Sequence, residues 1–365
     1  VSRLSTRSSV SLSFQVVGTG VLFLFAIQLL GSAVETLSPA LKRLLERIIV
    51  GDRSALGVSW LASYVLANGS IVAALSLTLF RSDLVVPSQL FLMVVGSRLG
   101  GAAIVLFIGA FDYLNEELES MSESVQLGLL TFLLTYSIYL PVLVIGYTVL
   151  PVVESWTGSN PVIAGETGIA DRLVPETDVP VPDIIPVFTE GIISAVGPVV
   201  AFLLAFGLIL LSMRLFDRAL DRVDKQRLRQ RYVKRLNDKW VSFTTGLVVT
   251  GLTMSVAFSL GVVVPLYNRG HIKRREIIPY VLGANIGTLL DTLIIAVALD
   301  IPVGVLTVGL LLALGLAVSV LPLLFYDTYV TTISAVDDSI SNNLVYFIAF
   351  LSSLAVVPVL LVVLR

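Results

Sequence analysis

Seven apolar stretches, each about as long as a bilayer is thick, constrain the fold of this chain more than any other feature. A helix needs about 20 mostly apolar residues to cross the hydrocarbon core of a membrane. Inside lipid, every backbone N–H and C=O group must find a partner within the protein, which favours helices. The sequence therefore predicts an all-α polytopic membrane protein. The predicted spans are 14–30, 87–111, 125–150, 187–213, 276–299, 303–326 and 344–364.

The composition excludes several classes of function. Hydrophobic residues make up 56% of the 365 residues and charged residues 14%, whereas soluble domains carry about 25% charged residues. The formal net charge of −2 offers no basic field for nucleic acid. The chain has no cysteine, which excludes thiolate metal sites and thiol nucleophiles, and its single histidine, His271, leaves no Ser/His or His/His constellation to build. We expect a protein that is not an enzyme and has no metal site.

Two further apolar stretches, 54–80 and 240–266, are interrupted by polar or small residues near their middles. The interruptions are Asn68-Gly69-Ser70 in the first stretch and Thr253-Met254-Ser255 in the second. Helix breaks at membrane depth are tolerated only where protein or a water-filled cavity surrounds them. Each stretch is therefore either an ordinary span or a re-entrant hairpin that enters and leaves on one face.

Basic residues on both sides of the second interrupted stretch favour the hairpin. Residues 214–239 hold ten Lys and Arg against four Asp, and Arg269, Lys273, Arg274 and Arg275 follow the stretch. The positive-inside rule places both flanks in the cytoplasm, which one crossing cannot do. A single crossing remains the alternative.

An internal repeat appears in two Gly-x-x-x-Gly segments, which begin at Gly96 and Gly283. The interval along the sequence from Gly96 to Gly283 is called the repeat offset below. Each glycine segment follows an interrupted stretch. We therefore predict two repeats of the form span, re-entrant hairpin, broken glycine-containing helix, span, with three full crossings each and hence inverted topology. The first repeat covers 14–150 and the second 187–326. An exterior acidic linker rich in Pro and Gly covers 151–186, and 344–364 is an additional helix.

Inverted repeats with broken helices are typical of secondary transporters, whose substrate site lies at the midplane where the breaks converge. Free N–H groups at a break can hold an anion, and free carbonyls with hydroxyls can hold a cation such as sodium. The alternative is that each glycine segment only permits close helix packing.

The segment Gly283-Ala284-Asn285-Ile286-Gly287-Thr288 resembles a Gly-x-Asn-x-Gly-Thr motif of the type II sodium-dependent phosphate cotransporters and their prokaryotic relatives. The stretches beginning at Gly246 and Leu22 are also similar to segments of that family. The resemblance covers about 14–111 and 203–299. It implies two inverted repeats, each with a Gln-Ser-Ser-Ser hairpin tip, and a phosphate and sodium site formed by those serines and by the Asn and Thr positions.

The chain departs from the family at both hairpin tips and at the first glycine segment. Ala67-Asn68-Gly69-Ser70 and Met254-Ser255-Val256-Ala257 stand where the family has Gln-Ser-Ser-Ser. Arg98 replaces the expected Asn, and Gly101 replaces the expected Thr. Phosphate and sodium therefore do not follow from the motifs alone.

Arg98 is the most informative of these departures, because a charge at mid-membrane must face a cavity or a partner. It could bind a substrate anion through its planar donors, form an ion pair with Asp291, or extend to an interface. Asp291 could coordinate a cation or carry a proton. The remaining predicted substrate-binding residues are Asn68, Gly69, Ser70, Thr253, Ser255, Asn285 and Thr288. The polar groups at the breaks could instead simply cap helix ends.

The sequence thus predicts a multi-pass protein of the cell (plasma) membrane that transports a small inorganic anion. Phosphate is the leading substrate. Transport is expected to occur by alternating access between the repeats. Sodium is a candidate coupling ion, and no other cofactor is expected. The expected partners of the protein are the anion and the lipid bilayer, and nucleic acid is not expected. The sequence does not decide between a monomer and a homo-oligomer. The alternative is a membrane scaffold or regulator whose substrate site has degraded and whose chamber is filled by Val and Leu.

Overall fold

Helices make up the described part of the chain in this computed structural model, which covers residues 2–115, 123–159, 184–221, 238–256, 258–260, 263 and 272–364. No strand occurs among those residues. Six segments within them are long and apolar enough to cross a membrane, so the chain is a multi-pass integral membrane protein. These segments are Gln15–Ile48, Gly128–Val152, Pro198–Leu220, Arg274–Ala298, Pro302–Leu324 and Leu344–Val363.

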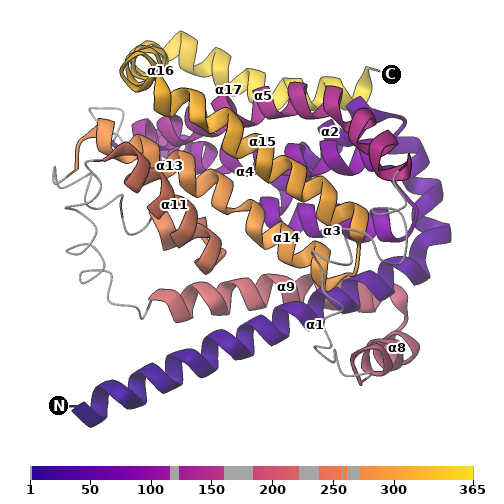
Figure 1. The fold of residues 1–365 in the computed structure, drawn as a ribbon. Helices are drawn as coiled ribbons and strands as arrows, with labels where there is room; N and C mark the ends of the chain where they lie inside the picture. Colours follow the sequence, from indigo (N-terminus) through magenta and orange to yellow (C-terminus); the bar gives the residue numbers. More distant parts are fainter. Residues whose placement is uncertain are drawn as a thin grey trace.

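Figure 1 shows the arrangement of the helices, with α1 and α9 side by side at one edge and α16 and α17 at the opposite edge. Along the first half of the chain, the helices are α1 (Ser2–Ile48), α2 (Asp52–Leu66), α3 (Gly69–Arg81), α4 (Pro87–Asn115) and α5 (Glu123–Ser159). Along the second half, the helices are α8 (Ile184–Val196), α9 (Pro198–Asp221), α11 (Lys239–Thr253), α13 (Arg274–Gly287), α14 (Leu289–Ala298), α15 (Pro302–Leu324), α16 (Tyr326–Ser341) and α17 (Leu344–Val363).

Three predicted spans differ from the helices observed. The predicted span 187–213 is divided into α8 and α9, because Gly197 has φ +81 and Pro198, at the start of α9, has no N–H to donate. The predicted span 14–30 lies within α1, which continues to Ile48. The predicted span 276–299 is divided at Thr288 between α13 and α14.

The predicted linker 151–186 lies mostly outside the described residues, and so does His271. At its beginning, the linker is helical, because α5 continues through Pro151 to Ser159.

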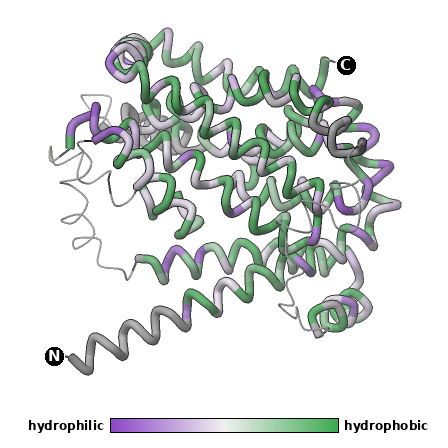
Figure 2. Tube along the Cα trace, viewed as in Figure 1, coloured by the Kyte–Doolittle hydropathy of each residue, from purple (hydrophilic) through white to green (hydrophobic). Residues whose placement is uncertain are grey.

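Hydrophobic residues occur along nearly all of the described helices (Figure 2), and many large ones are exposed in addition to those in the core. On α9, for example, Val199 and Leu203 are exposed while Ala201 and Ala205 are buried. An apolar exterior of this kind is stable only against lipid or another apolar surface. It agrees with a helical bundle that spans a membrane.

Both interrupted stretches leave the helical conformation at the predicted places. Between α2 and α3, Ala67 has φ +49 and Asn68 is extended. After α11, Met254 has φ +48, and a helical residue follows at Val256. Left-handed backbone is unfavourable for residues with a side chain, by roughly 1–2 kcal/mol, so tertiary contacts must hold each break in place.

The repeat offset, defined by Gly96 and Gly283, relates several features of the two halves. It leads from Asp52 at the start of α2 to Lys239 at the start of α11, and from Ala67 to Met254 at the breaks. It also relates two continuously buried runs, 90–100 on α4 and 277–287 on α13. These runs carry the two glycine segments.

The glycines pack against corresponding backbone atoms. A Cβ atom at Gly100 would lie closer than 3.0 Å to the carbonyl oxygen of Trp60, and one at Gly287 would approach that of Leu247 equally closely. A Cβ at Gly96 or Gly283 would likewise meet the carbonyl oxygen of Leu56 or Phe243. In both comparisons, the glycines and the carbonyl groups that they meet are related by the repeat offset. The α2–α4 and α11–α13 pairs therefore pack alike, with glycines that let the helices approach closely.

Candidate functional site

A cavity of about 660 Å³ lies where the two helix breaks and the two glycine segments meet. Its lining comes from α1, α3, α4, α5, α9, α13 and α14 and from the two breaks. Among the predicted site residues, those that line it are Asn68, Gly69, Ser70, Arg98, Ser255, Asn285, Thr288 and Asp291. Thr253 is not part of the lining, and its hydroxyl donates to the backbone carbonyl of Val249 at 2.6 Å.

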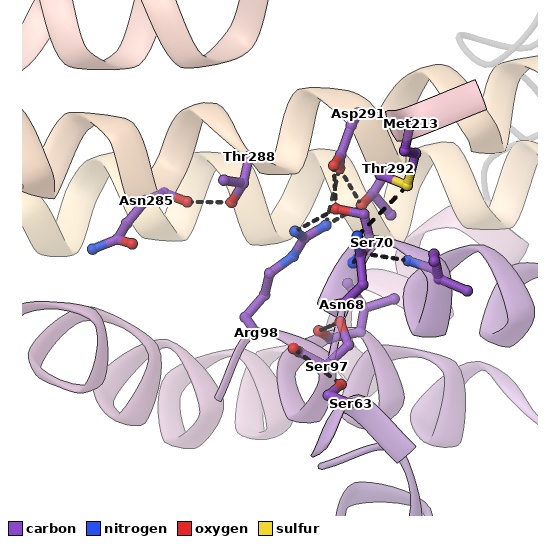
Figure 3. Close-up of polar contacts among 12 residues, drawn as sticks. Ser63, Asn68, Ser70, Ser97, Arg98, Met213, Asn285, Thr288, Asp291 and Thr292 are labelled. Carbon is purple, nitrogen blue, oxygen red and sulfur yellow. Dashed lines mark hydrogen bonds and ion pairs between the residues drawn. The ribbon is translucent and has the colours of Figure 1, made fainter. Parts of the chain in front are cut away.

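Arg98 and Asp291 form an ion pair across the cavity wall, with 3.0 Å between Nη2 and Oδ1. Arg98 is 7% exposed and Asp291 3% exposed. Figure 3 shows Arg98 extending from α4 towards Asp291 on α14, with Ser70 between them. The structure thus shows the ion-pair alternative for Arg98, and its guanidinium does not extend to an interface.

Two hydroxyl groups complete this ion pair. Thr292 Oγ1 accepts a hydrogen bond from Arg98 Nη2 and donates one to Asp291 Oδ1 at 2.8 Å. Ser70 Oγ accepts from Arg98 Nη1 at 3.4 Å and donates to Asp291 Oδ2. Ser70 reaches the pair because α3 begins at Gly69, where a Cβ atom would collide with the backbone of Ser97 on α4.

The break between α13 and α14 is held by side-chain donors. The backbone carbonyl of Asn285 accepts from Thr288 Oγ1 at 2.6 Å and from Tyr139 Oη at 2.9 Å. In a regular helix that carbonyl would accept the N–H group of Leu289. The side-chain amide oxygen of Asn285 accepts from Thr135 Oγ1 at 3.0 Å.

Two buried donors at the cavity have no hydrogen-bond partner in the structure. They are Nε of Arg98 and Nδ2 of Asn285. The whole residue Asn285 is 9% exposed. Each residue lies two positions after the first glycine of its segment, so Arg98 and Asn285 correspond to each other in the two repeats. Unsatisfied buried donors are rare in native proteins and call for a ligand or water. Both donors suit an anion.

One face of α9 contacts both helix breaks. Asn68 caps α3 by accepting from the N–H groups of Ser70 and Ile71, and its Nδ2 donates to Met213 Sδ at 3.6 Å. Ser255 Oγ accepts from the N–H of Phe258 at 3.1 Å and donates to Asp217 Oδ1 at 2.6 Å. Met213 and Asp217 lie one helical turn apart, so this face of α9 links the two breaks.

Sequence reasoning missed several residues of the cavity. Asp217 lies in the basic segment 214–239, where only the overall charge was interpreted. Thr131, Thr135 and Tyr139 line the cavity from α5 at a spacing of four, so a polar stripe in a predicted span was the available signal. Thr292 follows Asp291 directly, and it had no sequence signal of its own.

The described lining contains one cation and two carboxylates, namely Arg98, Asp291 and Asp217. Arg98 can attract an anion, and the carboxylates can hold a proton or a monovalent cation beside the hydroxyls. In the described ranges, no group of three or more His, Asp or Glu residues is placed to hold a metal ion.

A second charged cluster lies outside the cavity, between the start of α13 and α16. Arg274 pairs with Asp337 and, at 3.1 Å, with Asp338, while Arg275 pairs with Asp327. Burial raises the pKa of Asp337 to about 6, although Arg274 opposes this shift. Asp337 Oδ1 has no partner in the structure, which agrees with a carboxyl group that is partly desolvated.

Comparison with known families finds a match to one model, described as Na+/Pi-cotransporter, over residues 208–354. The match extends from α9 to α17 and includes the Asn285 segment and Asp291. It confirms the family resemblance seen in the second half of the sequence and does not extend to residues 14–111. No curated protein and no solved structure matches the chain.

Proposed function

We propose that this chain, which is a Na+/Pi-cotransporter relative by its residues 208–354, is a secondary transporter that moves a small inorganic anion through the cavity. The observation that carries the proposal is a buried guanidinium in a chamber where two helix breaks meet. The unpartnered Nε of Arg98 and Nδ2 of Asn285 supply two donors for the oxygen atoms of the anion. Phosphate is the leading substrate, because its tetrahedral oxygens can accept several such donors at once.

The architecture that we propose has two inverted repeats, 14–150 and 187–326, joined by an exterior linker. Helix boundaries, breaks, buried runs and glycine contacts that recur at the repeat offset support it. The two interrupted stretches would then be re-entrant hairpins whose tips meet at the cavity. Movement of one repeat against the other would open the cavity to either side of the plasma membrane in turn.

Sodium is the coupling ion that the family match suggests. Hydroxyl and amide oxygens at the breaks, together with a carboxylate, are hard ligands of the kind that a small cation prefers. Ser70, Ser255 and Thr288 offer such hydroxyls in the lining. These three hydroxyls are fewer than the hydroxyls of two Gln-Ser-Ser-Ser tips, so this chain could bind fewer sodium ions per anion than the family does. The uptake assay below should therefore also measure the number of sodium ions moved with each anion.

A scaffold with a degraded site is the alternative that the missing serines suggest. Two observations favour the transporter. The chamber is open and, although most of its wall is apolar, Val256 and Leu260 are the only Val and Leu residues in its described lining. The buried charge of Arg98 is also matched by a carboxylate and two hydroxyls, an arrangement that a disused site would have no reason to keep.

Uptake of radiolabelled phosphate into proteoliposomes, with and without an inward sodium gradient, tests the proposal. The informative variant is the double substitution Arg98→Gln/Asp291→Asn, which removes both charges together and leaves no buried carboxylate unpaired. Its matched control is Arg275→Gln/Asp327→Asn, which removes an exposed ion pair outside the cavity.

We expect the wild type and the control to take up phosphate at similar rates. The cavity variant should lose at least about tenfold, because a hydrogen bond from a charged donor contributes about 1.5–3 kcal/mol. Uptake by neither the wild type nor the control would support the scaffold. Equal uptake by the wild type and the cavity variant would refute the role of Arg98.

A further inference from the structure

We propose that the substrate anion and the carboxylate of Asp291 compete for Arg98, and that Asp291 binds a proton when the anion takes its place. One proton then moves with each anion, whether or not sodium binds as well. This inference rests on the proposed function. It adds the identity of a coupling ion and the residue that carries it.

The first step follows from the occupancy of the guanidinium. Nη2 donates to Asp291 and Thr292, Nη1 donates to Ser70, and Nε is the nitrogen without an acceptor. An oxyanion binds a guanidinium most strongly through two parallel hydrogen bonds. The N–H parallel to Nε–H belongs to Nη2, so an anion bound at Nε forms its second bond by taking Nη2 from its present acceptors. Asp291 is the acceptor whose negative charge the anion replaces.

The second step concerns Asp291 once Arg98 has turned to the anion. The carboxylate is 3% exposed and keeps only the hydroxyls of Ser70 and Thr292 as partners. A buried charge whose counter-charge has been removed is strongly unfavourable and is relieved by neutralisation. Asp217 lines the same cavity and adds a like charge. The substrate anion itself adds another.

The other charged groups on the described helices packed against α14 lie at helix ends, except Glu35 on α1. Arg81 is in the last turn of α3, eleven residues and about 16 Å of helix beyond Ser70. Lys239 begins α11, and Arg274, Arg275 and Glu276 begin α13. On α1, Glu35 is seven residues from Gln28, which contacts Ala298 at the far end of α14. α15 has no charged residue. Among the described residues that line the cavity, the titratable groups besides Arg98 and Asp291 are therefore Asp217 and the hydroxyl of Tyr139.

The exchange is balanced in charge and atoms. A hydronium ion in the cavity transfers its proton to an Asp291 carboxylate oxygen, and Ser70 or Thr292 then accepts a hydrogen bond from the new O–H. The anion accepts the N–H groups that Asp291 releases. For a monovalent anion the charge of the cavity is unchanged, so the loaded cavity and the empty cavity with its ion pair closed can both change the side to which they open. A loaded cavity with Asp291 deprotonated would carry one additional uncompensated negative charge during this change.

Binding of radiolabelled phosphate to the purified protein over a range of pH tests this exchange at constant sodium concentration. The variant is Asp291→Asn, which imitates the protonated carboxyl group. Phosphate itself titrates in this range, but equally for both proteins, so the ratio of their dissociation constants removes that effect. The control is Asp337→Asn, because Asp337 is also a buried, Arg-paired carboxylate but lies outside the cavity.

We expect the dissociation constant of the wild type, divided by that of Asp291→Asn, to rise about tenfold for each unit of increasing pH. Wild type and Asp337→Asn should show the same pH dependence. A ratio that stays constant while both proteins bind phosphate would overturn the proton exchange and leave the proposed function standing. Binding by none of the three proteins would instead overturn the proposed function.

Calorimetry on the wild type gives a second readout that does not depend on any variant folding. Phosphate is titrated into the protein in two buffers that differ in their ionisation enthalpy, which yields the number of protons taken up per anion bound. We expect about one proton more than the titration of phosphate itself accounts for. No excess proton uptake would overturn the exchange.

Discussion

The close contact between glycine and backbone carbonyl on α4 and α13 gives the sharpest test of the architecture. We expect Gly100→Ala and Gly287→Ala to destabilise the protein by similar amounts, because each new Cβ would lie closer than 3.0 Å to a carbonyl oxygen. The oxygens belong to Trp60 and Leu247, which are themselves related by the repeat offset. Gly309→Ala on α15 is the control, because nothing lies within 4 Å of its added Cβ.

The magnitude follows from the distances. Ordinary van der Waals contact begins at 3.4 Å, so each helix pair must separate by several tenths of an ångström or more to admit the methyl group. Overpacking of this kind costs about 1–3 kcal/mol. At Gly309 the same substitution should be neutral or stabilising by up to about 1 kcal/mol, because alanine is the better helix former.

Thermal unfolding of the detergent-purified variants, followed by circular dichroism and by the recovery of monodisperse protein, is the assay. For a chain of 365 residues, a loss of about 2 kcal/mol corresponds to a fall of about 3 °C in the apparent melting temperature. If either Gly100→Ala or Gly287→Ala melts like Gly309→Ala, the helices do not approach as closely as the structure shows. If only one of the two is destabilised, the two helix pairs are not packed alike.

Two other substitutions have clear expected outcomes. Asn68→Ala and Asn343→Ala each remove an N-cap that accepts two backbone N–H groups, so both should lose about 1 kcal/mol of stability. Only Asn68→Ala should also slow phosphate uptake, because only Asn68 lines the cavity; equal uptake rates would contradict this. For Asp337, the raised pKa of about 6 means that its stabilising contribution is complete below about pH 4 and is lost as the pH rises through about 6. Between about pH 4 and about pH 7, Asp337→Asn should therefore gain up to about 3 kcal/mol of stability relative to the wild type, as followed by melting temperature. A stability difference that stays constant over this range would count against the burial of Asp337.

The helical membrane fold was predictable because its signal is long and strong. Apolar stretches of bilayer length and the basic flanks of 240–266 require no knowledge of tertiary contacts. The two helix breaks were predictable for a similar reason, since Asn68-Gly69-Ser70 and Thr253-Met254-Ser255 interrupt otherwise apolar segments. Helix ends were less predictable. A glycine before a proline, Gly197-Pro198, divided a segment whose hydropathy alone indicates one span.

The site was predictable only in part, because sequence spacing shows which residues share a helix face but not which helices meet. Arg98 and Asp291 were singled out as rare charges in apolar segments, and their pairing could be offered only as one of three alternatives. The polar stripe on α5 and the contact of α9 with both breaks depend on tertiary packing. Asp217 was missed because ten basic neighbours dominated the interpretation of its segment.

The departures from the family motif form a consistent set when they are considered as charges. Arg98 alone, placed where the family has Asn, would leave an uncompensated buried cation, which typically destabilises a protein by about 3–5 kcal/mol. Its counter-charge, Asp291, comes from the other half of the chain, and Ser70 and Thr292 satisfy the hydrogen bonds that remain. Random loss of a substrate site removes polar atoms one at a time and does not supply matched partners from two other helices. Under the proposed function, the chamber would hold a charge pair that links its two halves where the family motif has hydroxyls, and a substrate anion would compete with that pair.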